Sequence, residues 1–213
     1  MMSTKTLIMD ADTFVAWAME QAEGRFELAA GEVVAMAPEC AAHNRVKGNV
    51  FRTLKRAIDE CDLPCEVFTD GMVVRIDQST VYEPDTMLRS GQSLADDAIE
   101  FSDPMIVVEV VSPSTRARDA GAKLADYFRL PSVRHYVLVR TDSHQAIHHV
   151  RGEDNVITTA IVNDGALRFD PPGIEVPLEV FLPRAERSAG EGLYGALSSS
   201  IRSRGLEPDD SGA

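Results

Sequence analysis

The strongest constraint on the fold of this chain is one carboxylate inside an apolar run, Glu109 within Ile106–Val111. Every other residue of the run is isoleucine or valine, a pattern typical of a β-strand that is covered on both faces. An ionised carboxylate at such a position loses its hydration, which costs on the order of several kcal/mol unless a partner compensates. The run therefore predicts a central strand whose glutamate meets a cation, a metal ion or a solvated cleft. A salt bridge that only fixes the register would satisfy the same requirement.

The surrounding pattern predicts a mixed α/β fold with helices packed against one central sheet. One helix is expected over 41–60, where apolar residues recur at helical spacing, and a second from Ser112 to about Leu130. A shorter first helix should begin after a cap at Asp10 or Asp12. Strands are expected at 25–28, 33–36, 65–69, 72–76, 81–88, 105–111, 135–140, 146–151 and 156–162, with 178–182 as a closing segment.

Turn residues divide these strands. Gly31 predicts a hairpin between 25–28 and 33–36, and Asp70-Gly71 predicts another between 65–69 and 72–76. Pro84 interrupts 81–88 and indicates an edge, a bulge or a strand start at that point. We expect residues 1–183 to form a single domain and residues 184–213, rich in Ser, Gly, Arg and acidic side chains, to form a flexible tail.

Charge narrows the function classes. The 213 residues include 21 Lys and Arg against 34 Asp and Glu, a formal net charge of −13. This disfavours a protein that coats nucleic acid or membrane surfaces, since such proteins are generally basic. No apolar run is long enough for a transmembrane helix, and the N-terminus lacks the pattern of a secretory signal. Three cysteines without an export signal favour a reducing, cytoplasmic location.

Two further residues accompany Glu109. Asp85 follows Pro84 inside a strand-like stretch; taken alone it is a turn residue, but together with Glu109 it could form a hard oxygen site for Mg²⁺. Lys123 lies beside the apolar stripe of the helix that follows Glu109, so its amine could lean over the strand ends. A surface pair with Asp119 at i,i+4 explains its spacing equally well.

The long helix carries two unusual polar residues. At about 100° per residue, His43 and Lys47 fall inside its apolar arc, which indicates a cavity or a partner, although a histidine bonded to backbone at a helix end is an equal alternative. The opposite side carries Arg45, Arg52 and Arg56, which could follow phosphates but more often form a solvated helix face. Elsewhere, Glu27 alternates with its apolar neighbours and faces either solvent or a site.

These residues occur along the chain in the same order as the motifs of a known family. The segments are Arg-Phe-Glu-Leu at 25–28, His43, Tyr-Glu-Pro-Asp at 82–85, Val-Glu-Val-Val-Ser-Pro-Ser-Thr at 108–115, Lys123 and Tyr127. Over roughly residues 10–183 the chain resembles the Uma-two family, in the restriction-endonuclease-like PD-(D/E)XK superfamily. The stretch at 108–115 with Lys123 and Tyr127 after it is the most specific part of the match.

The resemblance implies a restriction-endonuclease-like mixed β-sheet flanked by helices, and a metal-dependent endonuclease that hydrolyses phosphodiester bonds of nucleic acid, with DNA the expected substrate. It implies a homodimer and a Mg²⁺ or Mn²⁺ cofactor. The metal ligands would be Asp85, Glu109 and the Val110 carbonyl. Lys123 would assist from the helix, because Val111 occupies the position where the superfamily usually has its lysine.

The remaining site residues follow from the same resemblance. Glu27, His43 and Tyr127 would line the site, and a positive groove for nucleic acid would come from Arg45, Arg52, Arg56 and Arg116. Two alternatives stay open: a catalytically silent restriction-endonuclease-like protein that binds or regulates, and a metal-dependent hydrolase of another phosphoester. The net charge of −13 counts against a processive nuclease, whereas the intact set of Asp85, Glu109 and Lys123 favours an enzyme.

Overall fold

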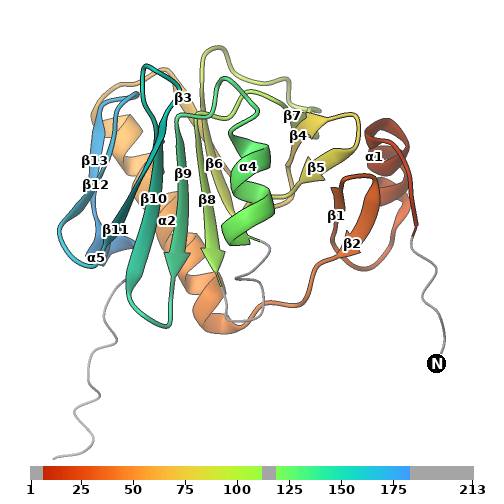
Figure 1. The fold of residues 1–213 in the computed structure, drawn as a ribbon, viewed down its shortest axis with the longest axis horizontal. Coiled ribbons are helices and arrows are strands. Elements are labelled where there is room, and N and C mark those ends of the chain that lie inside the picture. The colour runs from red at the N-terminus through yellow and green to blue at the C-terminus, as the bar shows by residue number, and fades with distance from the viewer. Residues whose placement is uncertain (1–6, 112–118, 183–213) are drawn as a thin grey trace, which may run out of the picture. The chain divides into compact units, whose positions relative to one another are not determined.

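The computed structural model describes residues 7–111 and 119–182, which contain a six-stranded mixed sheet (Figure 1). Its strand order is β11-β10-β9-β8-β6-β3, and only β8 and β9 run parallel. The strands are β3 (Cys65–Thr69), β6 (Thr86–Ser90), β8 (Ile106–Val111), β9 (His135–Arg140), β10 (Gln145–Arg151) and β11 (Ile157–Val162). The expected start of a helix at Ser112, Arg116 and the expected tail at 184–213 lie outside the described residues.

Helices cover both faces of this sheet, as the apolar run of β8 predicted. Helix α2 (Ala41–Glu60) packs on one face, where Val108 and Val110 join its buried side chains in one core cluster. The other face meets the π-helical turn η1 (Asp119–Lys123) and helix α4 (Leu124–Tyr127), where Val107 and Val111 pack in the cluster that contains Tyr127. Figure 1 shows α2 behind the sheet and α4 in front of it. Since side chains alternate along a strand, Glu109 belongs to the α4 face.

A second sheet has the order β2-β1-β5-β4-β7 and packs against α1 (Ala11–Glu20). Its strands are β1 (Phe26–Ala29), β2 (Glu32–Ala35), β4 (Val73–Asp77), β5 (Thr80–Tyr82) and β7 (Glu100–Phe101). A third, two-stranded sheet of β12 (Ala166–Phe169) and β13 (Ile174–Pro177) contributes to the α2-side core together with the short helix α5 (Leu178–Phe181). The mixed α/β class is thus confirmed, but the expectation of one central sheet is wrong.

Two turn signals had different outcomes. The hairpin around Gly31 is confirmed: β1 and β2 pair antiparallel, with positive φ at Ala30 and Gly31. The hairpin predicted at Asp70-Gly71 is wrong, although a turn does form there. β3 pairs with β6 in the first sheet, whereas β4 pairs with β5 and β7 in the second. The turn therefore connects two sheets, and local turn chemistry cannot distinguish this from a hairpin.

Pro84 marks a second connection between the sheets. The strand expected over 81–88 is divided into β5 and β6, and Glu83-Pro84-Asp85 lies between them. Proline cannot donate a ladder hydrogen bond, so the break falls where the chain leaves one sheet and enters the other. This places Asp85 at the start of β6, beside β8.

Among the described residues no helix is both long and apolar enough to cross a membrane.

A buried histidine pair predicts acid sensitivity. His135 Nδ1 lies 3.0 Å from His148 Nε2, and burial lowers the pKa of both imidazoles from 6.5 to about 4. Folding therefore favours the neutral forms, and the stability that they contribute is present above pH 6.5 and is lost as the pH falls towards 4. We expect the free energy of unfolding to drop by up to about 1.4 kcal/mol per pH unit for each histidine in this window.

Urea unfolding between pH 7.5 and 4.5 measures this slope. The double variant His135→Gln, His148→Gln should have a shallower slope than the native chain. The matched control is His144→Asn, on an exposed turn with positive φ that asparagine tolerates, and it should keep the native slope. Equal slopes in all three proteins would contradict the prediction.

Candidate active site

Lys123 is the cation that the carboxylate of β8 requires. Its ammonium donates to Glu109 Oε1 at 3.0 Å and to Glu27 Oε1, on β1, at 2.7 Å. All three side chains are at most 5% exposed. Tyr127, one helical turn after Lys123, donates its hydroxyl to the same Glu109 oxygen at 3.2 Å. We call these four residues the Lys123 cluster; it joins the second sheet, the central strand and the helix that covers it.

Aromatic rings surround the ammonium and the tyrosine hydroxyl. The Lys123 Nζ atom lies 5.2 Å from the centroid of the Tyr82 ring, a cation–π distance. Tyr127 packs between Tyr82 and Tyr136. Burial, together with the neighbouring Glu109 carboxylate, raises the pKa of Tyr127 well above its ordinary value. Tyr127 is therefore protonated at neutral pH and serves as a hydrogen-bond donor to Glu109.

Asp85 is bound from two sides. The backbone N–H of Val110 donates to Asp85 Oδ2 at 2.7 Å, which attaches the carboxylate to the residue that follows Glu109. From α2, Lys47 Nζ lies 3.0 Å from Asp85 Oδ1, and His43 Nε2 lies 3.4 Å from Oδ2. Burial acts to raise the pKa of Asp85, but the contacts with His43, Lys47 and the Val110 amide outweigh it and lower the pKa. The buried Asp85 is therefore ionised.

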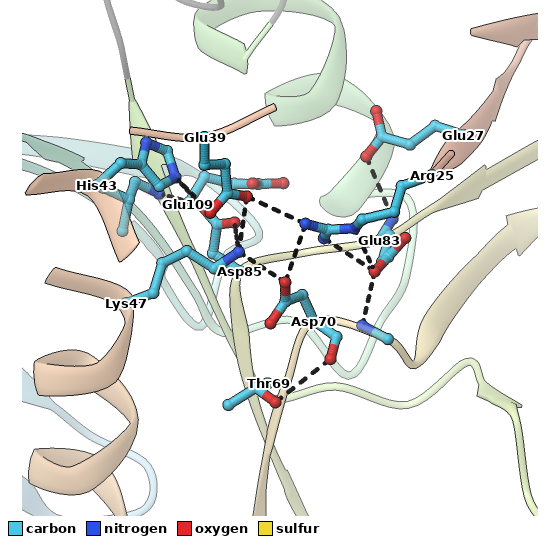
Figure 2. Close-up of polar contacts among 12 residues, drawn as sticks. Arg25, Glu27, Glu39, His43, Lys47, Thr69, Asp70, Glu83, Asp85 and Glu109 are labelled. Atoms are coloured by element: carbon cyan, nitrogen blue, oxygen red, sulfur yellow. Dashed lines mark hydrogen bonds and ion pairs between the residues drawn. The ribbon is translucent and has the colours of Figure 1, made fainter. Parts of the chain in front are cut away.

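Lys47 binds three carboxylates at once (Figure 2). Its ammonium lies 2.8 Å from Glu39, 2.8 Å from Asp70 and 3.0 Å from Asp85, and the residue is 4% exposed. Burial acts to lower the pKa of Lys47, but Asp85 and the other carboxylates raise it to about 12. The expectation that a lysine in the apolar arc of this helix has a partner is confirmed. We call Glu39, His43, Lys47, Asp70 and Asp85 the Lys47 cluster.

Arg25 and Glu83 connect the two clusters. The Arg25 guanidinium contacts Glu39, Asp70 and Glu83 at 2.9–3.1 Å. Glu83 accepts from the N–H of Gly71, and its own backbone N–H donates to Glu27 at 3.2 Å. Hydrogen bonds and ion pairs thus run without interruption from α2 to α4, and they hold the turn at Asp70-Gly71 where the expected hairpin ladder is missing.

The structure brings most of the predicted site residues into this network. Glu27, His43, Asp85, Glu109, Lys123 and Tyr127 all belong to it, and the backbone of Val110 contacts Asp85. Arg45, Arg52 and Arg56 do not join it: all three are exposed, and helical geometry puts them on the side of α2 opposite to His43 and Lys47. Arg116 lies outside the described residues.

Sequence reasoning missed Glu39, Asp70, Arg25 and Glu83 as members of the site. Asp70 had a sufficient local explanation as a turn residue, and Glu83 and Arg25 stood only as letters of a family segment. Glu39 did carry a signal, because it lies four residues before His43 and contacts it at 3.9 Å. A carboxylate spaced four residues from a candidate histidine could have been examined as its partner.

The donor set suits a divalent cation. Asp85, directly before β6, and Glu109, on the adjacent interior strand β8, provide carboxylate oxygens, the ligands that Mg²⁺ and Mn²⁺ prefer. The buried His43 Nε2 makes no hydrogen bond within the described part of the chain. It faces the carboxylate oxygens of Asp85 at 3.4 Å and Glu39 at 3.9 Å, an arrangement that is compatible with a cation site.

A six-stranded mixed sheet with helices on both faces, and with buried acids and a buried lysine at its interior strands, defines a mixed α/β fold. The chain is similar to a solved structure described as a "putative nuclease belonging to DUF820" from Anabaena variabilis, with a TM-score of 0.66, 11% identity, and coverage of 83% of this chain and 97% of the other. At that identity the likeness shows the fold alone.

The profile of the Uma2 family, described as "Putative restriction endonuclease", matches residues 11–182. The chain therefore belongs to the Uma2 family. It is also 27% identical over 151 residues to the uncharacterized protein sll1609 of Synechocystis sp., an alignment that covers 69% of this chain and 84% of that relative. The resemblance inferred from the sequence is confirmed at the level of family and fold.

The Lys47 cluster supports a stability prediction. Replacing Lys47 by methionine would leave the carboxylates of Glu39, Asp70 and Asp85 facing one another without their shared ammonium. We expect Lys47→Met to lower the free energy of unfolding by about 3 kcal/mol, the lower end of the cost of breaking a buried ion pair, because Arg25 still contacts Glu39 and Asp70. Lys55→Met is the matched control, since Lys55 lies on the same helix, is half exposed and, within residues 7–111 and 119–182, pairs with Asp59 alone.

Lys55→Met should change the free energy of unfolding by less than about 0.5 kcal/mol, because exposed i,i+4 pairs contribute little. Urea titration followed by circular dichroism measures both variants. Similar small effects for the two would show that the three carboxylates do not depend on Lys47.

Proposed function

We propose that this protein is a divalent-metal-dependent endonuclease that hydrolyses phosphodiester bonds of nucleic acid, with DNA as the first substrate to test. The observation that carries the proposal is the buried ammonium of Lys123 bonded to Glu109, next to an ionised Asp85 that is held on the backbone of Val110. Membership of the Uma2 family supports the same reaction class. Residues distant in sequence thus bring two acids and an amine to the adjacent interior strands β6 and β8.

In this proposal Asp85, Glu109 and the carbonyl of Val110 hold Mg²⁺ or Mn²⁺. The N–H and C=O of one strand residue point to the same side, so the amide bond from Val110 to Asp85 indicates that the Val110 carbonyl also faces that side. When bound, such an ion coordinates a non-bridging phosphate oxygen and acidifies the attacking water. The two carboxylates fix the place where the scissile phosphate is received.

Lys123 supplies the remaining positive charge. Its ammonium is held by Glu27 and Glu109, so it can orient a water molecule and stabilise negative charge that develops on the phosphate oxygens. Glu27 is a positioning residue, because it acts through Lys123. Tyr127 is another, since its hydroxyl fixes the rotamer of Glu109. Both keep the acids and the amine in place before substrate binds, which avoids reorganisation during the reaction.

One observation favours the second candidate, a catalytically silent protein that uses the fold for binding or regulation. Lys47 and Lys123 already give Asp85 and Glu109 a positive partner each. A site that is electrostatically satisfied in this way persists without any ion, so the acids do not by themselves require catalysis. The homodimer and the cytoplasmic location stay predictions from the sequence.

Cleavage assays with active-site variants test the proposal. Purified protein with Mg²⁺ or Mn²⁺ should nick supercoiled plasmid or cut oligonucleotides. Asp85→Asn, Glu109→Gln and Lys123→Met should each reduce the cleavage rate by at least about 100-fold, because each removes charge at the reacting phosphate. Lys55→Met, on the exposed side of α2, should cleave at the native rate.

Thermal melting establishes that each variant is folded before its rate is compared. Cleavage that survives in both Asp85→Asn and Glu109→Gln would overturn the assignment of the site. Absence of cleavage by the folded native protein, on DNA and RNA alike, would favour the silent alternative.

A further inference from the structure

The carboxylates of Glu39 and Asp85 present the same arrangement to α2. Each gives one oxygen to Lys47, Glu39 Oε1 at 2.8 Å and Asp85 Oδ1 at 3.0 Å. The second oxygen of each faces His43, whose Nε2 lies 3.9 Å from Glu39 Oε2 and 3.4 Å from Asp85 Oδ2. Figure 2 shows the imidazole beside both carboxylates, on the side away from the Lys47 ammonium.

These spacings match a coordination shell. Ligand atoms of the three residues all lie within 4.8 Å of one another. Around an ion with bonds of about 2.1 Å, adjacent ligand atoms are roughly 3–3.5 Å apart. The distance from His43 to Asp85 falls in this range. The distance from His43 to Glu39, 3.9 Å, is longer than this range. Of the three side chains, that of Glu39 has the most rotatable bonds, so a change of its rotamer can shorten this distance.

His43 provides an independent indication of a ligand. Its Nε2 atom is buried, and within the described residues it contacts Asp85 and Glu39 at 3.4 and 3.9 Å without a well-aligned hydrogen bond. A buried polar atom without a hydrogen bond is costly, so a native protein usually provides a partner. Two carboxylate oxygens in front of an imidazole nitrogen are the partners that a shared cation would have.

Charge points to a dication. In the described residues around His43, which is itself counted as neutral, the carboxylates of Glu39, Asp70, Glu83 and Asp85 face the cations Arg25 and Lys47. The carboxylates exceed the cations by two charges. One divalent ion would balance this excess without moving either Arg25 or Lys47.

We propose that Glu39, His43 and Asp85 form a second cation site, which binds a divalent transition-metal ion, Mn²⁺ in preference to Mg²⁺. The preference follows from the imidazole nitrogen, which suits first-row transition ions, whereas Mg²⁺ favours an all-oxygen shell. The site shares Asp85 with the metal of the proposed function but does not use Glu109, Val110 or Lys123. Its occupation does not depend on whether the protein cleaves nucleic acid.

Electron paramagnetic resonance of Mn²⁺ bound to the full-length, metal-stripped protein tests this site. In the native protein, pulsed spectra should contain hyperfine coupling from one imidazole nitrogen. His43→Ala should remove that coupling and weaken Mn²⁺ binding about tenfold or more, while Mg²⁺ binding measured by calorimetry should change much less. His144→Asn, the exposed control, should retain both the coupling and the affinity.

Two further variants keep the test decisive. Glu39→Gln removes one ligand oxygen charge but leaves the imidazole in place. It should therefore weaken Mn²⁺ binding and preserve the nitrogen coupling. This variant keeps the site testable if His43→Ala fails to fold. Glu109→Gln should preserve both the coupling and the affinity of this site while it abolishes cleavage. This result separates failure of the second site from failure of the proposed function.

The proposal is overturned if the native protein binds no Mn²⁺, if bound Mn²⁺ shows no nitrogen coupling, or if the coupling persists in folded His43→Ala. Nitrogen coupling that is lost in His43→Ala supports the site, even in a protein that cleaves no nucleic acid.

Discussion

The structure depends on an ammonium buried between two carboxylates. Glu109 stands in a strand covered on both faces, and it is tolerated there because Lys123 and Tyr127 meet it from the covering helix and Glu27 approaches from the second sheet. A buried ion pair of this kind adds little net stability compared with apolar packing, but loss of one partner is costly. Its contribution is therefore specificity of arrangement: β1, β8 and α4 must all be in place before the charges are compensated.

Lys47 repeats this solution at the neighbouring acid. Asp85 lies where the chain passes from one sheet to the other. The ammonium of Lys47 compensates the negative charge of Asp85 and also the charges of Glu39 and Asp70. The two lysines approach from helices on opposite faces of the six-stranded sheet. Asp85 is thus ionised and both acids are fixed in position by the fold itself, and in the proposed function preorganisation of this kind would reduce the cost of binding.

Features with a local cause could be predicted from the sequence. The bounds of α2 follow from its apolar repeat, the β1–β2 hairpin follows from Gly31, and the burial of Glu109 follows from its apolar neighbours. The pairing of strands could not be predicted, because Asp70-Gly71 and Pro84 have the same local chemistry whether the chain stays in one sheet or changes sheets. Glu39 and Asp70 were missed for the same reason: their role arises from Lys47, which reaches them only in the folded chain.

If Lys123 has the role proposed for it, its position illustrates how one chemical requirement permits two sequence solutions. The superfamily pattern described above has a lysine two residues after the strand acid, where this chain has Val111. Residues 109 and 111 point to the same face of β8, and Val111 packs there with Tyr127. Lys123 reaches that same face from the helix above and places its ammonium 3.0 Å from Glu109. The requirement is thus a cation on one face of one strand, and either the strand or the helix that covers it can satisfy this, because both border the same buried volume.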